Sequence, residues 1–132
     1  MVYPPNIIII EIIKLKDMQH FKTISELIAS YKILAYPGRI YSELNGKSNL
    51  TNSQYWIISS KEQKDEDMIE VNGECVPESV APYHVKSFLS VGTFQDIIEV
   101  KLANNPNLSV NMDADVFIEA INYYLENDDF MD

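Results

Sequence analysis

The chain has 132 residues and a formal net charge of −10 at pH 7, with 46% hydrophobic and 11% aromatic residues. This length fits a single domain, residues 1 to 132, and the apolar content excludes a disordered acidic tail. The charge disfavours nucleic acid and anionic membrane as partners, because both would repel the chain. The single cysteine, Cys75, excludes an intramolecular disulfide and fits a cytoplasmic protein.

No segment is apolar enough to predict a membrane span. The most apolar run, residues 7 to 13, is interrupted by Glu11. It is far shorter than the roughly 20 residues that a spanning helix needs. The N-terminus lacks the positive start of a secretory signal. A second methionine, Met18, leaves open whether residues 1 to 17 belong to the domain or extend it.

The first segments of the chain are predicted to form a strand and then a helix. Residues 7 to 14 are rich in β-branched side chains, which favours a strand. From about Met18 the apolar spacing becomes helical, and the Pro-Gly pair at 37–38 ends the predicted helix. Thr23 and Glu26 have capping-box spacing, in which a hydroxyl and a carboxylate satisfy free backbone amides.

The middle of the chain predicts short strands separated by turns. The strands are expected at 39–44, 55–59, 68–71 and 83–91, with turn dipeptides at 45–46 and 72–73. We expect residues 61–67 to form a charged loop and residues 77–82 to be irregular.

Two helices complete the predicted domain. The first begins at Thr93, with Asp96 at the capping-box position, and the Asn-Pro-rich residues 104–107 end it. The second runs from about Asp113 to Asn127. This order predicts an α+β domain. It has a small, mainly antiparallel sheet and about three helices, two of them C-terminal, packed on one face.

The negative charge is concentrated in two stretches of the chain. Glu62 to Glu78 carries seven acids and one lysine, and Asp113 to Asp132 carries seven acids and no base, which gives −6 and −7. Nine bases and six acids remain elsewhere, a charge of +3. A concentrated negative field attracts a cationic partner. The alternative interpretation is a solvated surface that only keeps a small protein soluble.

The sequence lacks strong signatures of an enzyme. Its two histidines, His20 and His84, have no accompanying residues that specify catalysis, and its four glycines are not clustered into a phosphate-binding loop. Three His and Cys residues in total are too few for a zinc site. We therefore predict no enzyme, no cofactor and no metal. A small carboxylate-dependent hydrolase is the third function that we consider.

The acidic stretches are best interpreted as a surface that binds a protein partner. The active site of a basic nuclease is built to hold phosphate, so an acidic protein can occupy or cover it. Exposed aromatic residues nearby, Tyr55 or Tyr83, would supply anchors that charge alone does not. The predicted partner-binding residues are Glu62, Asp65, Glu66, Asp67, Glu70 and Glu74, with Asp128 and Asp129 as second choice.

The C-terminal half resembles a family of small acidic bacterial proteins. The residues that carry the likeness are Phe94-Gln95-Asp96-Ile97-Ile98 and Ala120-Ile121-Asn122-Tyr123-Tyr124, followed by Asn127-Asp128-Asp129-Phe130. The likeness covers about residues 80 to 131, and Lys22 to Leu27 fits the family's usual opening. Ile121 replaces an aromatic residue of the family motif, and Asp129 replaces an alanine. We interpret the motif as structural, with Tyr124 packing on Phe130 and Asn127 capping the helix.

Some members of this family occur beside toxin genes as immunity proteins of contact-dependent inhibition and similar polymorphic toxin systems. The resemblance therefore implies an immunity protein that neutralises a cognate toxin domain. Together with the charge, it suggests that the toxin is a basic nuclease whose active site or substrate groove is blocked. The alternative is an acidic adaptor, or a nucleic-acid mimic, that binds a basic host protein. The resemblance supplies no catalytic residue.

Overall fold

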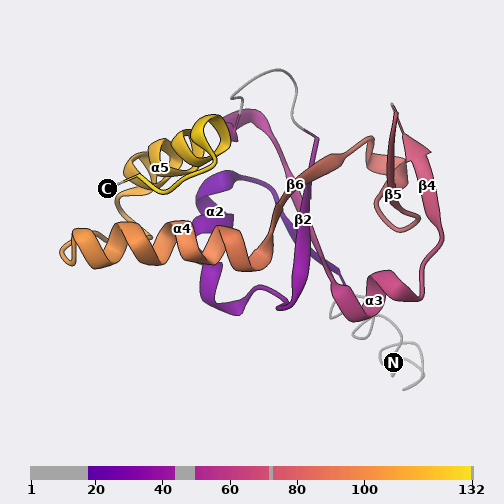
Figure 1. Cartoon of the computed structure of the whole chain (residues 1–132), viewed down its shortest axis with the longest axis horizontal. Coiled ribbons are helices and arrows are strands. Elements are labelled where there is room, and N and C mark those ends of the chain that lie inside the picture. Colours follow the sequence, from indigo (N-terminus) through magenta and orange to yellow (C-terminus); the bar gives the residue numbers. More distant parts are fainter. Residues whose placement is uncertain (1–17, 44–49, 72, 132) are drawn as a thin grey trace, which may run out of the picture.

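A computed structural model describes residues 18–43, 50–71 and 73–131 and confirms an α+β fold (Figure 1). One antiparallel sheet has the strand order β1-β3-β2-β6, and β4 and β5 form a separate hairpin. The strands are β1 (Met18–Phe21), β2 (Gly38–Ser42), β3 (Tyr55–Ser59), β4 (Met68–Val71), β5 (Glu74–Pro77) and β6 (Lys86–Ser90). The α-helices are α2 (Ile24–Ala29), α3 (Ser60–Lys64), α4 (Val91–Asn104) and α5 (Ala114–Asn127). The 3-10 turns of the described residues are η1 (Tyr31–Ile33), η2 (Leu50–Asn52) and η3 (Ala81–Tyr83).

The four-stranded sheet carries a hydrophobic core on each face. Helices α2, α4 and α5 cover one face, and the β4–β5 hairpin lies on the other side (Figure 1). Because neighbouring residues of a strand point to opposite faces, Ile57 of β3 joins the core on the helical side. Trp56 and Ile58 join the core that Val76 of the hairpin completes. Burial on both faces explains the continuous apolar run of β3.

The helix predicted from Met18 to the Pro-Gly pair at 37–38 was wrong at both ends: α2 covers only Ile24–Ala29, and the 3-10 turn η1 follows it. Residues Met18–Phe21 form the edge strand β1, paired with β3 from Met18↔Ile58 to Phe21↔Tyr55. Pairing with β3 overrides the helical spacing, because local propensity is weak against tertiary packing. The predicted cap at Thr23 is confirmed, since Glu26 N donates to Thr23 Oγ1 at 3.1 Å.

The structure also corrects several predictions in the middle of the chain. The expected charged loop at 61–67 begins as helix α3, whose first turn is capped by Ser59, and β5 was not predicted. The last strand is shorter than residues 83–91, because His84 adopts a left-handed backbone with φ 56° after turn η3. The expected strand at 7–14 and the turn at 45–46 lie outside the described residues.

The C-terminal helices lie side by side and follow the predictions closely. Helix α4 begins at Val91, two residues before Thr93, because Ser90 is the cap: Thr93 N donates to Ser90 Oγ at 3.1 Å. Helix α5 matches its predicted range. The rings of Tyr124 and Phe130 pack at 5.3 Å, and Asn127 Nδ2 donates to the Tyr123 carbonyl at 2.9 Å, as expected. Across the described part of the chain, no helix combines the length and apolarity of a membrane span.

Candidate functional site

The structure brings the first acidic stretch to one end of the molecule. Glu62 lies in α3, Glu70 in β4 and Glu74 in β5, while residues 65–67 connect α3 to β4. This end lies on the side of the sheet that carries the hairpin, away from α2, α4 and α5 (Figure 1). The hydroxyl of Tyr41 donates to Gln63 Oε1 at 3.0 Å and so ties α3 to the sheet. All six predicted residues of this stretch are therefore held on one side of the sheet.

Two of these six carboxylates form internal hydrogen bonds. Glu66 accepts from both the backbone N and the hydroxyl of Ser79, at 2.8 and 3.1 Å. Glu74 Oε1 accepts from the backbone N of Ser87 at 2.7 Å. These bonds fasten the connection between α3 and β4 to the turn after β5, and the hairpin to β6. Glu66 and Glu74 therefore shape this end of the molecule.

Asp65, Asp67 and Glu70 are exposed, and they lie beside exposed apolar residues. Met68 is 46% exposed and Ile69 is 40% exposed. A strand on a folded domain usually buries one face, but β4 exposes consecutive residues that point to opposite faces. We refer to the exposed side chains of Asp65, Asp67, Met68, Ile69 and Glu70 as the hairpin surface. The sequence prediction included the three carboxylates and missed the two apolar residues, although both lie between acids.

The second-choice acids lie elsewhere. Asp128 and Asp129 follow α5, on the opposite side of the sheet from the hairpin (Figure 1). Asp128 ends the helix in a left-handed conformation with φ 53°, and its backbone N donates to the Tyr124 carbonyl at 2.8 Å. Asp129 Oδ1 accepts from the backbone N of Phe130 at 2.8 Å. The two acidic stretches therefore do not form one continuous surface.

The two aromatic residues proposed as anchors differ in the structure. Tyr55 is fully buried, so its prediction as an exposed anchor was wrong; its hydroxyl donates to the Leu50 carbonyl at 2.9 Å. Burial also raises the pKa of Tyr55 well above its ordinary value. Tyr83 is 46% exposed and stacks on Trp56 with ring centroids 4.8 Å apart. Trp56 stacks in turn on His20 at 4.8 Å, so the exposed ring of Tyr83 is held firmly.

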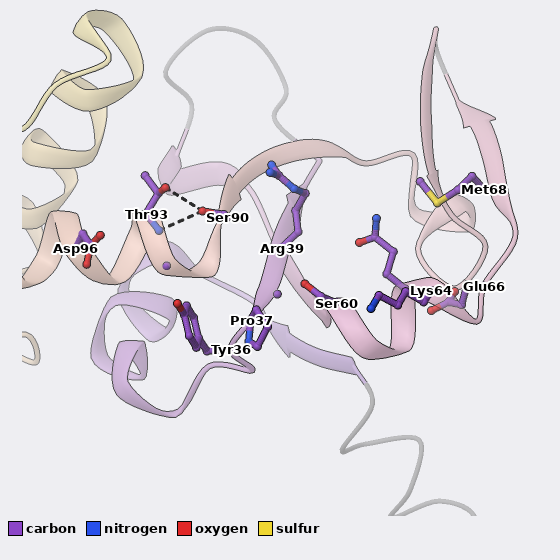
Figure 2. A pocket seen from close by; sticks show the side chains of 13 residues that line it. Tyr36, Pro37, Arg39, Ser60, Lys64, Glu66, Met68, Ser90, Thr93 and Asp96 are labelled. Carbon is purple, nitrogen blue, oxygen red and sulfur yellow. Dashed lines mark hydrogen bonds between the residues drawn. The ribbon is translucent and has the colours of Figure 1, made fainter.

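An open groove of about 850 Å³ adjoins the hairpin surface at Met68 (Figure 2). Its walls come from the start of β2, from α3 and from the first turns of α4. Figure 2 shows Arg39 between Lys64 on α3 and Asp96 on α4. Arg39 Nη1 donates to Ser87 Oγ at 2.8 Å. The groove combines two cationic and two acidic residues, Arg39, Lys64, Glu66 and Asp96. Sequence reasoning missed it because its walls are far apart along the chain.

Comparison with known proteins found no protein-family model, no curated protein and no solved structure that matches this chain. Within residues 18–43, 50–71 and 73–131, no group of three or more His, Cys, Asp or Glu side chains could hold a metal ion. The arrangement of the hairpin surface suits recognition of a cationic protein, because it places charge beside exposed apolar area.

Proposed function

We propose that this protein is an immunity protein that binds a cognate toxin domain, a basic nuclease, and blocks its active site or substrate groove. The observation that carries the proposal is the hairpin surface, where the exposed carboxylates of Asp65, Asp67 and Glu70 flank exposed Met68 and Ile69. A nuclease concentrates positive charge where it holds phosphate, so its active site is complementary to this surface. The protein acts by occupying its partner, and the proposal needs no catalysis, cofactor or metal.

Charge and apolar area have separate tasks in this proposal. The carboxylates steer the encounter with a basic partner, which raises the association rate. Met68 and Ile69 supply apolar area that is removed from water in the complex, which slows dissociation. Glu66 and Glu74 keep the hairpin in position through their bonds to Ser79 and to β6. The proposal places the protein in the cytoplasm, where the exposed free thiol of Cys75 would stay reduced.

The first experiment is co-purification with the product of the adjacent gene, together with a growth assay that expresses that product alone. We expect a stable complex, toxicity of the product alone, and rescue by this protein. Absence of both complex and toxicity would contradict the proposal.

Charge reversal then locates the interface. Asp67→Lys with Glu70→Lys should weaken binding at least about tenfold, mainly through slower association, and should flatten its dependence on salt. The matched control is Glu119→Lys with Glu126→Lys, which makes the same charge change at exposed positions of α5. Surface plasmon resonance at several salt concentrations measures both rates. Equal effects of the two pairs would show that the hairpin surface does not determine binding, and that either net charge or the second acidic stretch contributes as much.

A further inference from the structure

Strand β4 has one edge that β5 does not use. In the hairpin, Met68 pairs with Pro77 and Glu70 pairs with Cys75. Pro77 has no backbone N–H, so the Met68–Pro77 pair cannot exchange two backbone hydrogen bonds. Hydrogen-bonded and non-hydrogen-bonded pairs alternate along an antiparallel ladder. The backbone N–H and C=O groups of Met68 and Glu70 therefore point away from β5.

These outward groups are open in the described part of the chain. No hydrogen bond from another described segment reaches the backbone of Met68 or Glu70. The edge strand β6 is different, because the Glu74 carboxylate accepts from the backbone N of Ser87 there. Folded proteins commonly protect an edge strand with lysine, proline or a bulge. Strand β4 contains no lysine or proline, pairs without a register shift, and is the outer strand of the hairpin (Figure 1).

We propose that β4 accepts an extended basic segment of the partner as an additional strand. This inference rests on the proposed function and specifies how the hairpin surface would bind. Backbone hydrogen bonds to Met68 and Glu70 would supply affinity, and side chains would supply specificity. Glu70 complements lysine or arginine on one face of the incoming strand, while exposed Ile69, whose side chain points to the opposite face, complements an apolar residue there. The expected segment therefore alternates basic and apolar residues.

The charge of Glu70 disfavours a second copy of this chain as the occupant. Antiparallel pairing of β4 with β4 of another copy through the outward groups of Met68 and Glu70 would place the two Glu70 carboxylates at diagonal positions on one face. Like charges across neighbouring strands destabilise a sheet. The exposed edge is thus better suited to a cationic strand than to self-association.

The test uses the full chain and a defined probe, a short acetylated and amidated peptide that alternates lysine and valine. Isothermal titration calorimetry compares this peptide with one of the same sequence whose backbone amides are N-methylated. Methylation keeps the charge and removes the backbone donors. We expect the parent peptide to bind and the methylated peptide to bind at least about tenfold more weakly.

Two substitutions at position 70 distinguish the contribution of the outward backbone N–H from that of the carboxylate charge. Glu70→Gln and Glu70→Pro both remove the carboxylate, but only proline also removes the outward N–H. Pairing with β5 uses the backbone of Ile69 and Val71, so the hairpin can form in both variants. We expect Glu70→Pro to bind the parent peptide about tenfold more weakly than Glu70→Gln.

Amide hydrogen exchange is measured on the unmodified chain, so its result does not depend on whether a variant folds. The parent peptide should slow exchange at Met68 and Glu70 more than at other residues of the hairpin. The strand-addition proposal is overturned if the two peptides bind equally or neither binds, if the two variants bind equally, or if these amides stay unprotected. The proposal would also be overturned if the free chain forms dimers and Glu70→Pro makes it monomeric. Each of these results leaves the charge-reversal test of the proposed function intact.

Discussion

Gly38 lies where the chain enters β2, and the backbone of two other segments approaches it closely. A Cβ at this position would collide with the Ala35 carbonyl oxygen and lie 2.9 Å from the Ile58 carbonyl oxygen. Backbone atoms cannot move aside without disturbing the pairing of β2 with β3. We expect Gly38→Ala to lower the free energy of unfolding by about 3 kcal/mol, measured by urea denaturation.

Gly92 is the matched control at the residue scale. Its added Cβ would lie 3.1 Å from Cε2 of Tyr36, a ring that is 71% exposed and can shift. Gly92 lies in the first turn of α4, where alanine has the higher helix propensity. Gly92→Ala should therefore leave the free energy of unfolding unchanged or raise it. A similar loss of stability in both variants would show that close backbone packing at Gly38 is not the cause.

At the scale of elements, the acids of the hairpin divide into those that hold it and those that are available to a partner. Glu74→Ala would leave the backbone N of Ser87 without its carboxylate acceptor. Charge-assisted hydrogen bonds contribute more than neutral ones, so we expect a loss of about 2 kcal/mol in the free energy of unfolding. Glu70→Ala removes an exposed carboxylate with no bond to the fold and should change that free energy by at most about 0.5 kcal/mol. Thermal and urea denaturation of both variants measures this difference.

In a binding assay with the partner, we expect the larger effect from Glu70→Ala, which is the opposite of the order expected for stability. Glu70→Ala should weaken binding more than it affects folding, whereas Glu74→Ala should affect folding more than binding at temperatures where the hairpin is intact. If Glu74→Ala leaves stability unchanged, the hydrogen bond to Ser87 does not hold the hairpin in solution.

The hairpin contains one strand that could be predicted from the sequence and one that could not. Strand β4 was predictable because three of the four residues of Met68–Val71 are apolar and the segment ends at a turn dipeptide. Gly73 takes the left-handed conformation that such turns need, with φ 85°. Strand β5 was missed because Pro77 and the acid at Glu74 argue against a strand, and only pairing with β4 stabilises it. The exposure of Met68 and Ile69 was equally hidden, since no local pattern shows that a strand lacks a covering layer.

At the scale of the whole molecule, the number of charges can be read from the sequence, but their positions in space cannot. The acidic stretches were predicted as two clusters, and the fold puts them on opposite sides of one sheet (Figure 1). The groove of Figure 2 depends in the same way on contacts between distant segments. By contrast, the α+β class and helix α5 follow from local apolar spacing and caps, which is why they were predictable.

The two cores on opposite faces of the sheet share a sensitivity to high pH. Tyr31 and Tyr55 lie in the core on the helical side, and Tyr41 lies in the core on the hairpin side. Burial is the main cause that raises the pKa of each hydroxyl above its ordinary value of 10.0, and the Glu99 carboxylate raises that of Tyr31 further. The folded state therefore holds these protons more tightly than the unfolded state.

The sign of the pH dependence follows from linkage. Stability from these raised pKa values is complete below pH 10.0, the ordinary value, and is lost as pH rises through the folded-state values. We expect the free energy of unfolding to fall above that pH, with buried phenolates appearing together with loss of the circular dichroism signal.

Tyr55→Phe should lower the free energy of unfolding by about 1 kcal/mol at neutral pH, because the hydrogen bond to the Leu50 carbonyl is lost. That deficit should shrink in alkali, whereas Tyr36→Phe at an exposed position should leave the alkaline midpoint unchanged. Ionisation of all eight tyrosines in one step with the fold retained would contradict this coupling.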